Sequence, residues 1–73
     1  MSRRSADVAK RDAGYHAADM VKDGMIVGLG TGSTGYHAMV RLSARVRDEE
    51  ISVAGVPTSY QAAMRARELG IPL

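Results

Sequence analysis

The sequence contains no cysteine, tryptophan or phenylalanine, and only three tyrosines among its 73 residues. The absence of cysteine excludes disulfide bonds and thiolate metal sites. Few large aromatic side chains are present to enlarge the core, and a domain of about 60 residues buries only about 60% of its unfolded surface. We therefore expect these residues to be part of a larger protein.

Long apolar runs and clustered charge are also lacking. The longest apolar run, residues 25–29, is far shorter than the roughly 20 residues of a membrane span, and residues 1–5 lack the apolar core of a signal peptide. Ten basic against eight acidic residues leave a net charge of +2. The densest basic group, Arg41, Arg45 and Arg47, is followed by acidic residues, which is typical of a solvated helix face. We expect a cytoplasmic protein that binds neither nucleic acid nor membranes.

Three segments have the apolar spacing of amphipathic helices. Ser5 is the expected N-cap of the first helix, and Gly24 the left-handed residue beyond its end. The second helix is expected to end near Arg47, and the third to begin with a capping box between Thr58 and Gln61 and to end at Gly70. The positions assigned to the apolar faces and the core are Ala6, Ala9, Ala13, Ala17, Met20, Val21, Met25, Tyr36, Met39, Val40, Leu42, Val46, Tyr60, Ala63 and Met64.

Two apolar runs, residues 25–29 and 51–56, are typical of β-strands, and Pro57 ends the second. The first run does not alternate with polar residues, which predicts a strand covered on both faces. The order helix, strand, helix, strand, helix indicates an α/β fold, a Rossmann-like parallel sheet with flanking helices. Because another apolar run starts at Ile71, residues 1–73 are interpreted as a portion of one α/β domain whose sheet is incomplete.

A glycine-rich segment, residues 30–35, joins the first strand to the second helix with the sequence Gly-Thr-Gly-Ser-Thr-Gly. Backbone N–H groups in such a loop, together with a helix N-terminus, bind phosphate, and ligands of parallel sheets bind at this edge. Thr31, Ser33 and Thr34 add hydroxyl donors. The alternative is that Ser33 or Thr34 serves only as an N-cap. Three glycines and three hydroxyls exceed what a cap requires, so we predict phosphate binding.

Two other phosphate loops fit the sequence less well. The glycines satisfy the GxGxxG pattern of dinucleotide sites, but such a site also needs an acidic residue at the end of the second strand. Glu49 and Glu50 instead precede that strand. The Lys and Ser or Thr that a nucleotide P-loop requires are replaced by Tyr36 and His37.

Residues 26–34 resemble the phosphate loop of type A ribose-5-phosphate isomerase, particularly its archaeal branch. Further similarities to the amino-terminal part of that family lie at Lys10, Arg11, Gly14, Asp23, Gly24, residues 55–61 and residues 69–73. The resemblance implies interconversion of D-ribose 5-phosphate and D-ribulose 5-phosphate through an enediolate, in the pentose phosphate pathway. It also implies that the enzyme uses no metal or organic cofactor and is a homo-oligomer when full length.

The resemblance places the substrate-binding Thr-Gly-Ser-Thr segment of the family on Thr31, Gly32, Ser33 and Thr34, and a lysine near the phosphate on Lys10. Lys10 and Gly14 are four residues apart, so they share a helix face, and we expect Gly14 to allow a close approach of this face to the loop. A Lys10 side chain that faces the loop and one that is solvated fit the sequence equally well. The Asp-Gly-Ala-Asp and Lys-Gly-Gly-Gly segments and the catalytic glutamate of the family have no counterpart here. We therefore expect no catalytic residue in this chain and no activity from it alone.

A non-catalytic sugar-phosphate sensor built on the same β-α-β unit remains the alternative, and a dinucleotide-binding fragment is a third. His37 and His16 are assigned to packing or to the surface, because no partner residue is evident for either. Thr58 and Ser59 are assigned to a helix cap, although their loop also opens on the ligand side of the sheet. A chain folded alone is expected to expose a sheet edge and apolar surface, and so to be marginally stable or to self-associate.

Overall fold

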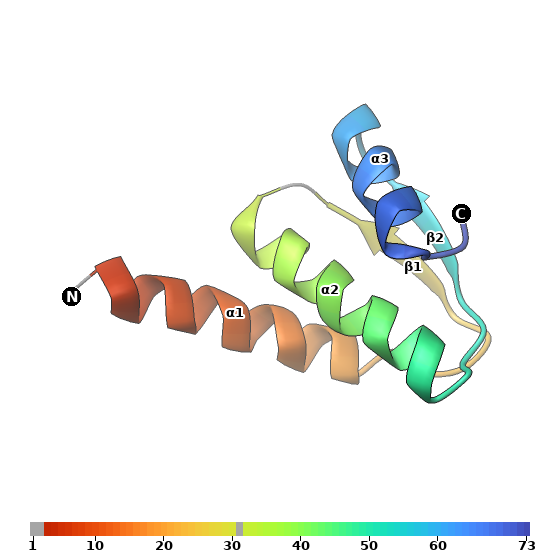
Figure 1. Ribbon diagram of the computed structural model, residues 1–73, viewed down its shortest axis with the longest axis horizontal. Helices are drawn as coiled ribbons and strands as arrows, with labels where there is room; N and C mark the ends of the chain where they lie inside the picture. The colour runs from red at the N-terminus through yellow and green to blue at the C-terminus, as the bar shows by residue number, and fades with distance from the viewer. Residues whose placement is uncertain (1–2, 31) are drawn as a thin grey trace.

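The computed structural model describes residues 3–30 and 32–73 (Figure 1). The elements follow the predicted order: α1 (Arg3–Asp19), β1 (Ile26–Leu29), α2 (Ser33–Asp48), β2 (Ala54–Pro57) and α3 (Tyr60–Leu69). Among the described residues, no helix combines the length and apolarity needed to cross a bilayer.

The two strands form a parallel pair, with Ile26 opposite Ala54 and Leu29 opposite Pro57. The backbone N–H of Gly55 also donates to the carbonyl oxygen of Pro72 at 2.7 Å. The chain after α3 therefore begins to run beside β2, as the apolar run after Gly70 predicts. The α/β fold class with a parallel sheet is confirmed.

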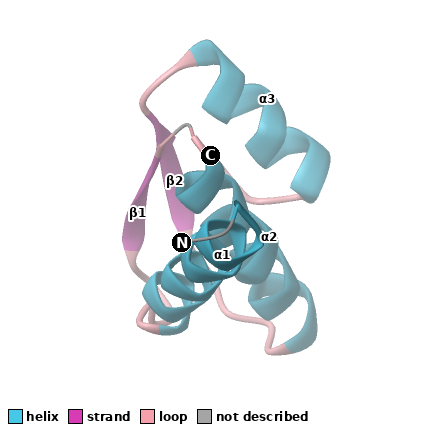
Figure 2. Cartoon of the chain, turned by 90° about the vertical axis from the view of Figure 1, so that its left-hand side faces the viewer, coloured by secondary structure: helices cyan, strands magenta, loops and turns pink. Residues whose placement is uncertain are grey.

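All three helices lie on one side of this sheet (Figure 2). On that side Leu29 is buried, whereas on the opposite side the side chains of Ile26 and Val56 are 77% and 52% exposed. The prediction that the first strand is covered on both faces is wrong for this chain, because no described element packs on the second face. The open face carries the apolar side chains that a helix layer covers in a doubly wound sheet.

The core lies between the sheet and the helices, where small and large apolar side chains interlock. Its buried members are Ala18, Val21, Leu29, Met39, Leu42, Val53, Ala62, Ala66 and Ile71. Of the methionines assigned to packing, only Met39 is buried, and Met20, Met25 and Met64 are 64%, 42% and 43% exposed. Alanines instead form the contact face of α3, because Ala62 and Ala66 let the helix approach the sheet closely.

The buried face of α1 is also different from the predicted one. Gly14 and Ala18 are buried, whereas Ala9, Ala13 and Ala17 of the predicted stripe are exposed. Alanine is a good helix former that contributes little apolar area, so alanine spacing does not specify which face packs.

The ends of α1 differ from the prediction at both termini. The helix begins at Arg3, so Ser5 lies inside it and is not the N-cap. Arginine has a higher helix propensity than serine, which favours the earlier start. The helix ends at Asp19, before Gly24, whose φ of 85° serves a turn in front of β1. The N–H of Gly24 donates to the carbonyl oxygen of Ser52 at 2.6 Å, which fixes that turn beside the second strand.

The cap of α3 is Ser59, one residue later than predicted. Its hydroxyl oxygen accepts a hydrogen bond from the N–H of Ala62 at 3.1 Å. The capping box at Thr58 is wrong, because Thr58 donates to the carbonyl oxygen of Leu29 through its N–H at 2.9 Å and its hydroxyl at 3.0 Å. Gly70, with a φ of 77°, ends the helix as predicted.

Candidate functional site

The glycine-rich segment lies between the carboxyl end of β1 and the start of α2. Thr31 lies outside the described residues. The N-cap of α2 is Gly32, whose φ of 96° favours glycine, and no side chain of the described chain caps this end. The alternative in which Ser33 or Thr34 acts only as the N-cap is therefore wrong.

The first turn of α2 presents backbone donors at this end. The first intrahelical hydrogen bond runs from the N–H of Tyr36 to the carbonyl oxygen of Gly32, at 2.9 Å. The amides of Ser33, Thr34 and Gly35 precede it and have no acceptor one turn earlier within the helix. Because the side chains of Ser33 and Thr34 are also exposed, amide and hydroxyl donors gather at the positive end of the helix dipole.

Gly35 brings the helix against the end of the strand. A Cβ atom at this position would lie 2.7 Å from the carbonyl oxygen of Gly30 and 3.1 Å from its carbonyl carbon. Any larger residue would push the loop and the helix apart. The glycine pattern of the sequence therefore has a packing requirement at Gly35 and a backbone requirement at Gly32.

Gly14 makes a similar close approach from α1. A Cβ atom there would lie 2.7 Å from the carbonyl oxygen of Thr34, 2.8 Å from the nitrogen of Ala38 and 2.9 Å from the Cβ of His37. Lys10 is one helical turn before Gly14 on the same face, and α1 extends past the start of α2 (Figure 1). The expectation that Gly14 faces the loop end of α2 is confirmed, and Lys10 lies on the part of α1 that passes this end.

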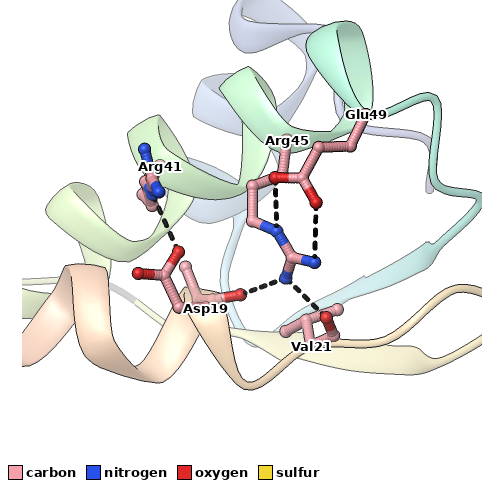
Figure 3. A network of polar contacts seen from close by, with 6 residues as sticks. Asp19, Val21, Arg41, Arg45 and Glu49 are labelled. Atoms are coloured by element: carbon pink, nitrogen blue, oxygen red, sulfur yellow. Dashed lines mark hydrogen bonds and ion pairs between the residues drawn. The ribbon is translucent and has the colours of Figure 1, made fainter.

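Two arginines of α2 hold the other end of α1 (Figure 3). The Nε of Arg41 donates to the carboxylate of Asp19 at 2.8 Å, and this hydrogen bond and negative charge raise the pKa of Arg41. Arg45 donates to the backbone carbonyl oxygens of Ala18, at 2.8 Å, and Val21, and pairs with Glu49 through two hydrogen bonds of 3.0 and 3.2 Å.

The Arg45 side chain is only 13% exposed. The sequence predicts a solvated helix face here, and for Arg45 that prediction is wrong. Its guanidinium lies against the carboxyl end of α1, where carbonyl oxygens without an intrahelical partner favour a cation.

Aromatic rings surround the imidazole of His37. The ring of Tyr15 lies edge-on to it at 6.3 Å and that of Tyr36 at 5.7 Å, measured between centroids. The Arg65 guanidinium lies 5.3 Å from the centroid of Tyr36. The packing role predicted for His37 is thus observed, and His16 is exposed on α1, as assigned. Arg65 reaches this end of α2 from α3 and has no signal in the local sequence.

The carboxyl edge of the sheet brings the loops after β1 and β2 together. Thr58 and Ser59 follow β2 at this edge, and both make the backbone hydrogen bonds described above. Glu49 is bound to Arg45 at the far end of α2, and Glu50 follows it. The acidic residue that a dinucleotide site requires after the second strand is therefore replaced by the sequence Thr-Ser.

A cavity of about 130 Å³ lies beneath the loop, between α1, β1 and α2. Its lining includes Val21, Val27, Leu29, Met39 and Leu42. These side chains are apolar, so the cavity does not suit a phosphate group. The donors for an anion lie instead at the exposed first turn of α2.

Comparison with known proteins gives a consistent result. The chain is 68% identical over 65 residues to ribose-5-phosphate isomerase A of Methanoregula boonei, which is 89% of this chain and 27% of that protein. It is 51% identical over 67 residues to the enzyme of the same name from Streptococcus thermophilus, 92% of this chain and 30% of that protein. No protein-family model matches the chain.

Solved structures show the same relationship. Ribose 5-phosphate isomerase A from Methanocaldococcus jannaschii superposes with a TM-score of 0.84 at 47% identity, over 88% of this chain and 28% of that one. The isomerase from Plasmodium falciparum superposes with a TM-score of 0.86 at 38% identity, over 92% and 29%. The chain thus spans less than a third of the length of these relatives. Over these residues, the chain is similar in sequence to ribose-5-phosphate isomerase A and has the same α/β fold.

Proposed function

We propose that this chain forms the phosphate-binding part of a ribose-5-phosphate isomerase, which interconverts D-ribose 5-phosphate and D-ribulose 5-phosphate. The observation that carries the proposal is the 68% identity to such an isomerase, in a chain whose α2 begins with a glycine-rich turn that no described side chain caps. In this proposal, residues 1–73 are the amino-terminal portion of one α/β domain.

The phosphate monoester binds at the start of α2. The amides of Ser33, Thr34 and Gly35 and the two exposed hydroxyls supply hydrogen bonds to its oxygens. Gly32 supplies the positive φ that the backbone adopts before the helix, and Thr31 joins the set through the resemblance alone. Lys10 supplies a positive charge from α1.

Isomerisation itself needs groups of another kind. Moving a proton between C1 and C2 requires a base over these carbons and donors for the enediolate oxygen. The described side chains that this edge brings together, those of Ser33, Thr34, Thr58 and Ser59, are hydroxyls and not carboxylates. Glu49, the first carboxylate after α2, is bound to Arg45 at the other end of the helix. We infer that the base comes from outside these 73 residues, and that the chain alone binds sugar phosphate without turnover.

Four further expectations accompany this proposal through the resemblance. The whole enzyme acts on a small sugar phosphate, forms a homo-oligomer and works in the cytoplasm. It uses no organic cofactor, since enediolate chemistry moves a proton and no net electrons.

Backbone NMR of the 15N-labelled chain tests phosphate binding directly. Ribose 5-phosphate and inorganic phosphate should both shift the amides of Ser33, Thr34 and Gly35 in a saturable way, whereas D-ribose should not. The Ser33→Ala and Thr34→Ala variants should bind phosphate more weakly, with Ser2→Ala as the matched control. Saturable binding of NADH with no response to phosphate would refute the proposal.

Activity measurements separate the isomerase from a sensor. The 73-residue chain should show no isomerisation of ribose 5-phosphate, whereas a form of the protein that extends past Leu73 should show it. A longer form that binds ribose 5-phosphate without isomerising it would support the sensor instead.

A further inference from the structure

We propose that Gly14 is a positioning residue of the anion site: it lets α1 contact the first turn of α2 closely, and so sets how near the preceding turn of α1, which carries Lys10, comes to the start of α2. The inference rests on the proposed function, since it takes the role of Lys10 from there and adds a role for Gly14. Its evidence is the geometry of the two helices.

Contact between the helices at Gly14 leaves no room for a side chain. The three atoms nearest to a Cβ there all belong to α2, and two of them, the Thr34 oxygen and the Ala38 nitrogen, are backbone atoms. Backbone atoms of a helix cannot rotate away as a side chain does, so an added methyl group must move one helix relative to the other. Glycine also has a lower helix propensity than alanine, and the close packing of α1 on α2 offsets this loss here.

The position of the anchors determines which way α1 moves. Arg41 and Arg45 hold α1 near Asp19 and Ala18, at its carboxyl end (Figure 3). The main packing partner of α1 is α2. A methyl group on Gly14 therefore tilts the amino-terminal half of α1 outward about these anchors, and the displacement grows with distance from them.

Lys10 lies one turn beyond Gly14 in the direction away from the anchors, so it moves further than Gly14 itself. In the proposed site, its charge then lies further from the phosphate bound at the amides of Ser33 and Thr34. We expect Gly14→Ala to weaken phosphate binding by removing the contribution of Lys10, while the loop itself stays intact.

A double-mutant cycle with Lys10→Met separates this effect from damage to the loop. With inorganic phosphate as the probe, Lys10→Met and Gly14→Ala should each raise the Kd by about tenfold, the size of one charge-assisted hydrogen bond. The double variant should bind as weakly as either single one. Multiplicative losses would show that Gly14 supports the loop independently of Lys10 and would overturn the proposal, as would an unchanged Kd for Gly14→Ala.

A second measurement leaves Gly14 in place. The sequence has no cysteine, so Lys10→Cys creates a single attachment point for a nitroxide label. The label should broaden the amides of Ser33 and Thr34 more strongly than the same label at Asp12→Cys, which is about 200° further around the helix. Equal broadening from both positions would overturn the placement of Lys10.

The two measurements also distinguish this inference from the proposed function. If the unmodified chain does not bind phosphate but the label at position 10 still broadens the loop amides, the proposed function fails while the placement of Lys10 stands. If the chain binds phosphate and Lys10→Met binds equally well, the inference fails and the proposed function stands.

Discussion

Replacing Arg45 tests the attachment of α1 to the rest of the fold. The Arg45→Met variant keeps the aliphatic stem of the side chain but removes a guanidinium that donates to two backbone carbonyl oxygens and to Glu49. Hydrogen bonds from a charged donor contribute about 1.5 kcal/mol or more each, so the two carbonyl contacts amount to about 3 kcal/mol. The pair with Glu49, whose side chain is 51% exposed, adds little because water screens it.

A loss of about 3 kcal/mol is large for this chain, since a domain of its length has a total stability of about 4–11 kcal/mol. Urea unfolding followed by far-UV circular dichroism should show the midpoint lowered by roughly 3 M, for a slope of about 1 kcal/mol per molar. Arg41→Met is the matched control, one turn earlier on α2 and also bonded to α1. Because its pair with Asp19 is exposed on both sides, its effect should be far smaller and should vanish in 1 M salt. Equal midpoints for the two variants would refute the reasoning.

Three further perturbations test separate parts of the structure. Ser59→Ala should destabilise the chain by about 1 kcal/mol through loss of the α3 cap, and Gln61→Ala by much less; the reverse order in urea unfolding would restore the capping box to Thr58. Gly35→Ala should lower the free energy of unfolding by about 1–3 kcal/mol and weaken phosphate binding in an NMR titration, because the added Cβ collides with Gly30. Gly28→Ala is the control and should have neither effect, because nothing lies close to a Cβ at that position. Ile26→Thr should reduce self-association in analytical ultracentrifugation without loss of stability, and an unchanged association constant would place the contact surface elsewhere.

Local patterns in the sequence were sufficient to predict the element order and the glycine-rich turn. The apolar run before residue 30 and the glycine pattern after it specify a strand that passes into a helix, whatever surrounds them. Gly70 ends α3 in the left-handed conformation for the same local reason. These features depend on backbone conformations that a few neighbouring residues determine.

Features that depend on a partner far along the chain were predicted wrongly. Thr58 has the residue type of an N-cap, but the Leu29 carbonyl across the sheet takes its hydroxyl, and the cap passes to Ser59. Arg45 has the sequence context of a solvated residue, but the carboxyl end of α1 lies beside it. Neither acceptor is visible before the fold places it there.

The glycines near the start of α2 illustrate how such long-range contacts build the candidate site. Gly14 within α1 and Gly35 in the first turn of α2 are both unfavourable for helix formation, by up to about 1 kcal/mol each relative to alanine. At each of them a Cβ atom would meet backbone within 2.7 Å. Local preference and tertiary packing therefore conflict at two positions in two elements, and both conflicts occur around the same turn. Such conflicts concentrate where a function imposes a geometry that stability alone does not require. Glycines at these contacts let α1, the end of β1 and the start of α2 come together without intervening side chains, and the amide donors at the start of α2 stay exposed. A phosphate group needs donors that are exposed in this way.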